Sequence, residues 1–385
     1  MIRDNKQKLM EYLRAEVEAG YACGIQAAVF ENGHESFYSA YGMADRERGI
    51  FMSRDTVCRL YSLTKPVTAV AVWILKERGL LDFSRAVKDY LPQFSDMAVM
   101  DGFDLIPAAR DITVLDLLRM TSGLTYPDSD SAGRVMSGVF SEISEAIRKG
   151  QGYTTGQVLT KIAAAPLADQ PGERWRYGLS ADVLGGIIEV IAGRTLGEFF
   201  RQEIFEPLNM ADTGFYVTPE KQGRLAQLYK RTEAGTLEID QERHLGLTRC
   251  LEPPAFESGG AGLVSTLSDY ANFANMLAAG GIWNGSRILT EASVEAFTVN
   301  MLPEALLPTV NFPQMKGYGY GNLMRVNLGR GESLSAESRG EFGWDGWSGP
   351  YVTIDRARRR VFLSLMQISG WQHWPFVWKM RDVLE

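Results

Sequence analysis

The chain has 385 residues, 45% of them apolar and 23% charged, which is typical of a soluble globular protein large enough for two lobes. Its formal net charge is −7 and it contains no basic block, which argues against a nucleic-acid partner and against binding to anionic membrane surfaces. No apolar run approaches the length of a membrane span.

The N-terminal residues predict an amphipathic helix, because Leu9, Leu13 and Val17 recur at helical spacing up to Gly20. This stretch lacks the apolar core of a secretion signal, so we expect a cytoplasmic protein unless a leader has been removed. The cysteines are odd in number and include no close pair, which favours reduced thiols over a disulfide framework or a metal site. We expect neither a metal nor another cofactor.

Two apolar stretches, residues 25–30 and 36–41, flank the sequence Glu31-Asn32-Gly33-His34. Asn-Gly between apolar stretches is a strong signal for a β-hairpin. The chain is therefore predicted to begin with a helix and two paired strands.

A serine and a lysine stand three residues apart in the sequence Y-S-L-T-K-P at residues 61–66, directly before an apolar run. Proline is tolerated in the first turn of a helix, so Pro66 predicts that Ser62 lies at a helix N-terminus. Residues i and i+3 share a helix face, so the Lys65 amine can reach the Ser62 hydroxyl. The helix dipole there favours negative charge on Ser62 and opposes positive charge on Lys65. The pattern indicates a nucleophile with its own base, although S-x-x-K also occurs by chance on solvated helix faces.

The middle of the chain is predicted to be helical, and the end returns to strands. Helices are expected at residues 115–118, 183–191, 199–205, 267–277 and 374–384, and strands at residues 318–326, 351–354 and 361–366. Short turns between the strands favour an antiparallel sheet. The predicted fold class is α/β of the α+β type, with residues 1–80 and 255–385 forming an α/β lobe and residues 81–254 forming an inserted helical lobe.

A serine hydrolase needs a base, a proton shuttle and two donors for the oxyanion. The chain has only three histidines, His34, His244 and His373, and none lies in a sequence context that suggests a catalytic triad. It also lacks a G-x-S-x-G elbow. The composition therefore favours a mechanism without histidine, such as that of a serine-lysine pair.

Four motifs follow one another along the chain: S-x-x-K-P at residues 62–66, M-T-S-G-L at 120–124, P-G-x-x-W-x-Y at 171–177 and S-G-G-A-G-L at 258–263. Together they resemble the serine β-lactamase and penicillin-binding-protein-like superfamily over nearly the whole chain. Within it, the chain is most similar to the class C β-lactamases and, more closely, to the family VIII carboxylesterases. The resemblance implies a two-lobed β-lactamase-like fold with the active site between the lobes.

The resemblance also implies catalytic roles. Ser62 matches the nucleophile that is acylated, and Lys65 matches its proton acceptor. Tyr177 matches the tyrosine that moves the proton between the serine and the leaving group, although a core aromatic is the alternative. A phenol beside an ammonium ion is expected to have a lowered pKa, which suits this task.

The strand that carries Lys-Thr-Gly in the family corresponds to the sequence W-D-G-W at residues 344–347. The resemblance makes the main-chain N–H groups of Ser62 and Trp347 the oxyanion hole. It places Trp344, Asp345 and Gly346 against the substrate, although Trp344 is equally consistent with packing. The glycine-rich run at residues 258–262 fits no phosphate-binding fingerprint and predicts a tight loop beside the site.

Three positions depart from the β-lactamase pattern: Met120 stands where relatives often have histidine, and two further departures bear on the substrate. Trp344 stands where those enzymes carry the lysine that binds the substrate carboxylate, so the selecting charge is missing. Leu179 stands where class C enzymes place an asparagine that binds the acyl-side carbonyl. Both losses favour esters over lactams or peptides.

We therefore predict a serine hydrolase that cleaves small carboxylic esters through an acyl-Ser62 intermediate, with an apolar pocket formed by Tyr126, Trp344, Trp347 and Trp371. The alternatives are a weak β-lactamase, a D-amino-acid amidase or peptidase, and an acyltransferase. A penicillin-binding sensor that is acylated once and stalls is a further alternative from another class. The sequence does not predict the physiological substrate or the oligomeric state.

Overall fold

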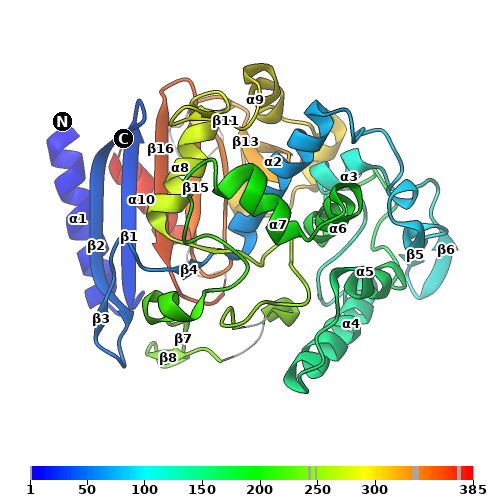
Figure 1. Ribbon diagram of the computed structural model, residues 1–385, viewed down its shortest axis with the longest axis horizontal. Helices are drawn as coiled ribbons and strands as arrows, with labels where there is room; N and C mark the ends of the chain where they lie inside the picture. Colours follow the sequence, from blue (N-terminus) through cyan, green and yellow to red (C-terminus); the bar gives the residue numbers. More distant parts are fainter. Residues whose placement is uncertain (1, 242–243, 248, 332–337, 371–373, 385) are drawn as a thin grey trace.

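The computed structural model describes residues 2–241, 244–247, 249–331, 338–370 and 374–384. Within these residues, the largest sheet has eight strands, and every neighbouring pair in it is antiparallel. Its strands, in spatial order, are β12 (Tyr318–Gly321), β13 (Met324–Asn327), β14 (Phe342–Asp345), β15 (Tyr351–Asp355), β16 (Arg360–Met366), β1 (Gly24–Glu31), β2 (His34–Asp45) and β3 (Ile50–Phe51). The two ends of the chain thus meet in one sheet, where β1 pairs with β16 (Figure 1).

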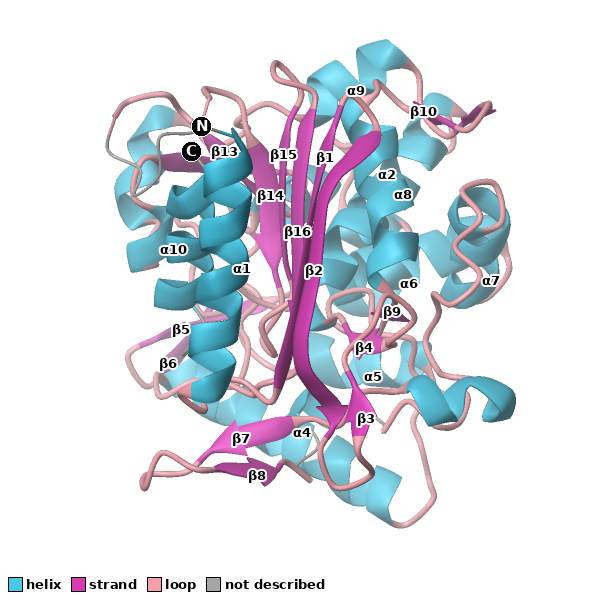
Figure 2. Ribbon diagram, turned by 90° about the vertical axis from the view of Figure 1, so that its left-hand side faces the viewer, coloured by secondary structure: helices cyan, strands magenta, loops and turns pink. Residues whose placement is uncertain are grey.

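Helices cover both faces of this sheet (Figure 2). One face carries α1 (Ile2–Glu18) and α10 (Trp374–Leu384), and the other carries α2 (Thr64–Glu77), α8 (Leu267–Ala278) and α9 (Glu291–Phe297). Leu9 and Leu13 of α1 are fully buried in one cluster with Val377 and Met380 of α10. The amphipathic spacing of α1 therefore serves to close the core on that face.

A group of helices lies at the opposite end of the molecule from α1 and α10 (Figure 1). It comprises α3 (Val114–Arg119), α4 (Ser131–Arg148), α5 (Thr155–Ala163) and α6 (Ser180–Ala192), and α7 (Leu196–Phe200) packs against α6 nearer the middle of the molecule. Small two-stranded sheets accompany the main elements: β4 (Cys58–Arg59) with β9 (Val264–Ser265), β5 (Ala98–Asp101) with β6 (Asp104–Pro107), β7 (Tyr229–Arg231) with β8 (Leu237–Ile239), and β10 (Ile282–Trp283) with β11 (Ser286–Arg287). The division into lobes at residues 80 and 255 stays a prediction.

The predicted N-terminal hairpin is confirmed. Asn32 and Gly33 have φ angles of 53° and 80°, as a two-residue type I′ turn requires, and Glu31 pairs with His34 across it. The mixture of helices with an antiparallel sheet also confirms the predicted fold class. None of the described helices is both long enough and apolar enough to cross a membrane.

The prediction of one strand over residues 318–326 is wrong, because the chain reverses within it between β12 and β13. Asn322 and Leu323 have φ angles of 51° and 62°, and left-handed backbone is uncommon for leucine. Distant contacts hold this turn: the Leu323 N–H donates to the Leu118 carbonyl at 3.1 Å, and Trp73 Nε1 donates to Asn322 Oδ1 at 2.8 Å. Nothing local in the sequence announces these partners.

Candidate active site

Ser62 lies in a short 3₁₀ turn, Tyr61–Leu63, that runs directly into α2. Pro66 is the third residue of α2, so it lies in the first turn as expected. Every residue of α2 from Thr64 to Leu75 is buried, which holds this end of the helix in place. Tyr61 has a φ of 45°, and such left-handed backbone in a bulky residue marks a position held by its surroundings.

Lys65 is fully buried beneath Ser62. Its Nζ donates to Ser62 Oγ at 3.0 Å, to Tyr126 Oη at 3.0 Å and to the Gly260 carbonyl at 2.8 Å. An ammonium group has three N–H donors, so these acceptors fix its position. Burial lowers the pKa of Lys65 to about 7, although the carboxylates of Asp182 and Asp345 oppose the shift. Near neutral pH, much of this amine is therefore unprotonated.

Asp182 of α6 holds the loop that receives Lys65. Its Oδ1 accepts from Ser258 Oγ at 2.5 Å and from the Gly260 N–H at 3.1 Å. A Cβ on Gly259 would lie 2.5 Å from the Ala181 carbonyl oxygen, so only glycine allows this approach. The expected tight loop at residues 258–262 thus lies directly against Lys65. No motif in the sequence pointed to Asp182.

Tyr177 lies beside Tyr126, with ring centroids 5.6 Å apart. Its Oη accepts a hydrogen bond from Trp344 Nε1 at 3.0 Å. Burial raises the pKa of Tyr177 well above its usual range, and this effect outweighs the hydrogen bonds from Ser62 and Trp344. The expectation of a lowered pKa is therefore wrong, because the site removes the phenol from water. Tyr177 stays protonated at neutral pH.

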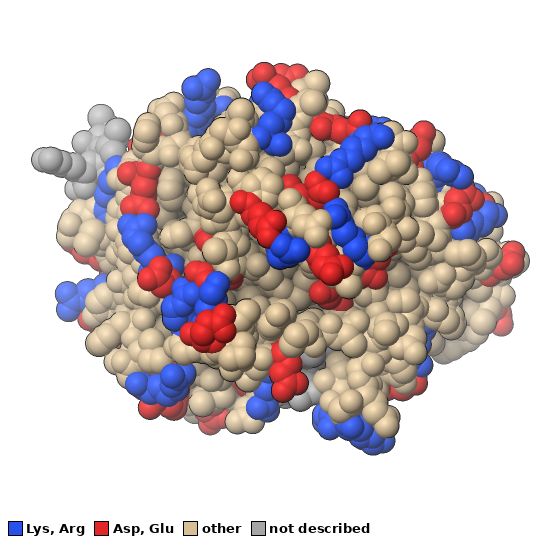
Figure 3. Space-filling view, viewed as in Figure 1, with Lys and Arg blue, Asp and Glu red and all other residues tan. Residues whose placement is uncertain are grey.

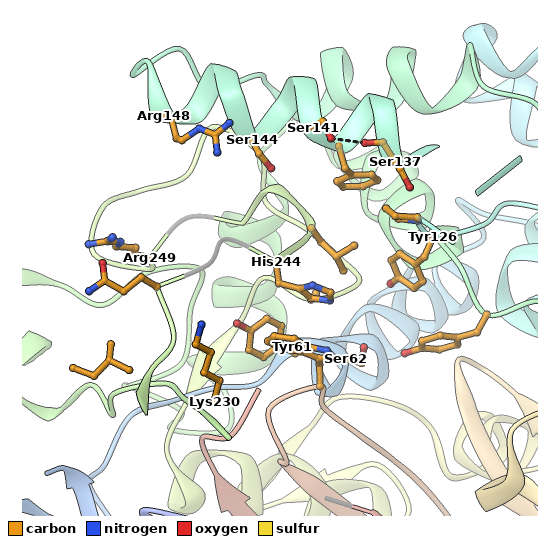
Figure 4. Close-up of a pocket in the computed structure, with 18 of the residues that line it drawn as sticks. Tyr61, Ser62, Tyr126, Ser137, Ser141, Ser144, Arg148, Lys230, His244 and Arg249 are labelled. Carbon is orange, nitrogen blue, oxygen red and sulfur yellow. Dashed lines mark hydrogen bonds between the residues drawn. The ribbon is translucent and has the colours of Figure 1, made fainter. Parts of the chain in front are cut away.

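A pocket of about 1060 Å³ opens above Ser62 (Figure 4). Tyr126, Tyr177 and Trp347, three of the predicted site residues, line it. Trp344 does not line it: its side chain is 2% exposed and contacts Tyr177 from behind. This arrangement makes Trp344 a support for the Tyr177 phenol.

Asp345, the last residue of β14, and Gly346, which follows it, are also predicted to contact substrate but do not line the pocket. Asp345 is 1% exposed, and it acts on the site through its charge near Lys65. A Cβ on Gly346 would lie 2.2 Å from the Leu60 carbonyl oxygen, so this glycine allows the strand to pack against the chain before Ser62. Trp371 lies outside the described residues.

His244 lines the same pocket, which sequence reasoning did not anticipate. Its ring stacks on Trp347 with centroids 4.1 Å apart and an angle of 6° between the planes. Burial lowers the pKa of His244 to about 4, so the imidazole is neutral at pH 7. No local motif marks this residue, because a distant segment of the chain brings it to the pocket.

The chain matches the Beta-lactamase family model over residues 9–378. It is 32% identical to Protein Rv1367c of Mycobacterium tuberculosis over 370 residues, which cover 94% of this chain and 89% of that protein. It is 29% identical to Esterase EstB of Burkholderia gladioli over 357 residues, which cover 87% and 83%. The solved structure of EstCE1, a hydrolase with promiscuous acyltransferase activity, matches 100% of this chain and 98% of its own, with a TM-score of 0.81 and 25% identity. The protein belongs to the Beta-lactamase family and has its fold.

Proposed function

We propose that the protein hydrolyses carboxylic esters through an acyl-enzyme on Ser62. The observation that carries the proposal is the 3.0 Å hydrogen bond between Ser62 Oγ and Lys65 Nζ, made by a buried lysine whose pKa is about 7. A base with this pKa is half unprotonated at neutral pH, which is the range in which general-base catalysis is most efficient. The similarity to an esterase over most of the chain supports the same conclusion.

In the acylation step, the neutral Lys65 amine takes the proton from Ser62 Oγ as the oxygen attacks the ester carbonyl carbon. Negative charge then develops on the carbonyl oxygen, and the N–H groups of Ser62 and Trp347 are the proposed donors to it. The Trp347 N–H makes no main-chain hydrogen bond to another described residue, so it is available for this role. Each such donor typically contributes on the order of a hundredfold or more in rate.

The leaving alcohol needs a proton, and Tyr177 is the proposed donor. Its raised pKa keeps the phenol protonated until an alkoxide, a much stronger base, forms beside it. The Lys65 ammonium, whose Nζ lies 4.8 Å from the centroid of the Tyr177 ring, then returns its proton to the phenolate. Water cleaves the acyl-Ser62 ester by the same steps in reverse, which restores Ser62 and releases the acid.

Esters are favoured over lactams by the chemistry of two buried positions. Trp344 occupies the strand position of the β-lactamase lysine and is 2% exposed, so it presents no cation to a substrate carboxylate. Leu179, at the position of the class C asparagine, is 1% exposed and offers no amide. An ester needs less help than an amide, because an alkoxide leaves more readily than an amine.

Acyl transfer is a second candidate, because an acyl-enzyme can react with an alcohol in place of water. The promiscuous acyltransferase activity named for EstCE1 supports it, as does a pocket with room for an acceptor. A weak β-lactamase, an amidase or peptidase, and a sensor that is acylated once remain as alternatives.

Turnover of p-nitrophenyl butyrate and nitrocefin by the wild-type protein and the Ser62→Ala variant, with intact-mass spectrometry, separates these functions. We expect rapid ester turnover, slow or absent nitrocefin turnover and no activity in Ser62→Ala. A mass increase equal to one acyl group that persists without turnover would indicate a sensor. A butyrate ester formed from an added alcohol would indicate acyl transfer. Ester turnover that survived in pure Ser62→Ala would contradict the proposal.

A further inference from the structure

One side of the pocket is cationic. Arg148 at the end of α4, Lys230 of β7 and Arg249 all line it. Figure 4 shows the labelled residues in order across the pocket: Arg148, Arg249 and Lys230 on one side, then Tyr61 and His244, then Ser62, and Tyr126 on the opposite side. Three segments that are far apart in the sequence therefore bring positive charge to the same end.

These cations are only partly neutralised. Arg148 forms an ion pair with Glu145 within α4, and Lys230 lies opposite Glu238 in the register of β7 and β8. Glu238 is the one carboxylate among the described lining residues. Lys230 and Arg249 form no ion pair with any described residue.

This excess of positive charge is local. The whole chain has a net charge of −7, and basic and acidic side chains are interspersed over the face shown in Figure 3. The protein as a whole therefore does not attract anions. An anion would be bound at this end of the pocket by nearby cations, because salt does not fully screen the attraction between charges at such short distances.

The two sides of Ser62 are distinguished by the chemistry proposed above. Tyr177, the proposed donor to the leaving alcohol, lies against Tyr126, on the side away from the cations. The alcohol half of the ester must therefore lie on that side. The side left for the acyl half, attached to Ser62 Oγ, is the one that runs past His244 to Lys230 and Arg249.

We infer that the acyl group of the physiological ester ends in an anionic group that Lys230 and Arg249 bind, with Arg148 at the rim. The inference rests on the proposed esterase function. Residues of α4 from Ser137, on the Tyr126 side, to Arg148 line the pocket, and at about 1.5 Å per residue this wall, which spans both halves of the ester, is roughly 16 Å long. The substrate class is thus a half-ester of a dicarboxylic acid whose acyl chain fits within that length, or an acyl group of similar shape and charge.

The test compares p-nitrophenyl monoesters of adipate, suberate and sebacate with the same esters methylated at the free carboxylate. For the chain length that fits, we expect kcat/KM to favour the anionic ester about fivefold at low salt, because exposed ion pairs contribute modestly. The preference should fall as salt rises. The double variant Lys230→Gln/Arg249→Gln should reduce the ratio to about one, and Glu238→Gln should raise it about twofold.

Arg231→Gln is the matched control. Arg231 is the next residue of β7, is exposed and does not line the pocket, since successive side chains of a strand point to opposite faces. This variant should keep the wild-type ratio and the wild-type rate on the methylated ester. Circular dichroism verifies that each variant is folded.

A binding measurement separates failure of this inference from failure of the esterase proposal. Suberamic acid and its neutral diamide cannot serve as esters, and tryptophan fluorescence can follow their binding. Tighter binding of the acid that is lost in the double variant supports the anion site even if no ester is hydrolysed. Equal rates on both esters, or a double variant that keeps the wild-type preference in rate and in binding, would overturn the inference.

Discussion

The two sides of the pocket are built in different ways. On one side, Ser62, Lys65 and Tyr177 are held by buried contacts: Lys65 is fully buried and has three acceptors, and Trp344 supports Tyr177 from behind. On the other side, Arg148, Lys230 and Arg249 are exposed. Burial shifts pKa values and fixes geometry, whereas exposed charges can only select among substrates. The groups proposed for the reaction and those proposed for substrate selection therefore lie on separate sides of the pocket.

The largest expected effect comes from substituting Ser62 or Lys65, the proposed nucleophile and its base on the buried side of the pocket. Ser62→Ala and Lys65→Met should each reduce kcat/KM for p-nitrophenyl butyrate by a thousandfold or more, on the order seen when a nucleophile or its base is removed. Stopped-flow or steady-state assays measure this loss. His244→Gln is the matched control within the same pocket. A loss in His244→Gln equal to that in Lys65→Met would make the histidine the base and contradict the assignment.

The two phenols beside Lys65 should differ in their effect. Tyr177→Phe removes the proposed proton donor and should reduce kcat about a hundredfold. Tyr126→Phe removes an acceptor of the Lys65 ammonium, which lowers the pKa of Lys65 and costs less in rate. The acid limb of its pH profile should therefore move to lower pH. If Tyr126→Phe proved the more damaging, Tyr126 would be the proton shuttle.

The pH dependence of kcat/KM tests the state of the buried lysine. Lys65 accepts a proton only when it is neutral, so activity should rise with pH and level off above its pKa of about 7. Well below that value, each pH unit should cost about tenfold. His244, whose pKa is about 4, does not titrate between pH 5 and pH 8. The His244→Gln variant should therefore show the same rise of kcat/KM with pH as the wild type. A flat profile between pH 5 and pH 8 would contradict a titrating Lys65.

The smallest expected effect concerns Trp344, which packs behind Tyr177. Trp344→Phe keeps an aromatic ring but removes the N–H that donates to Tyr177 Oη. We expect kcat to fall about fivefold with little change in KM, because the loss of one hydrogen bond mispositions the phenol and leaves the pocket lining intact. The double variant Trp344→Phe/Tyr177→Phe should have the same kcat as Tyr177→Phe alone. A raised KM with unchanged kcat would instead mean that Trp344 contacts substrate.

The sequence by itself determined the elements whose causes are local. The spacing of Ser62 and Lys65 places them on one helix face, Pro66 marks the helix start, and Asn32-Gly33 marks the hairpin. Each depends on the geometry of a few consecutive residues, which the chain specifies directly. The order of the motifs was also enough to predict the Beta-lactamase fold, which the family match confirms.

The tertiary structure alone decided the properties that depend on burial and on distant partners. Burial raised the pKa of Tyr177, where its ammonium neighbour predicted a lowered value. Distant contacts placed His244 beside Trp347 and reversed the chain at Asn322. The cationic side likewise assembles from α4, β7 and the segment at Arg249. Desolvation and long-range contacts are sums over the whole fold, so no stretch of the sequence displays them.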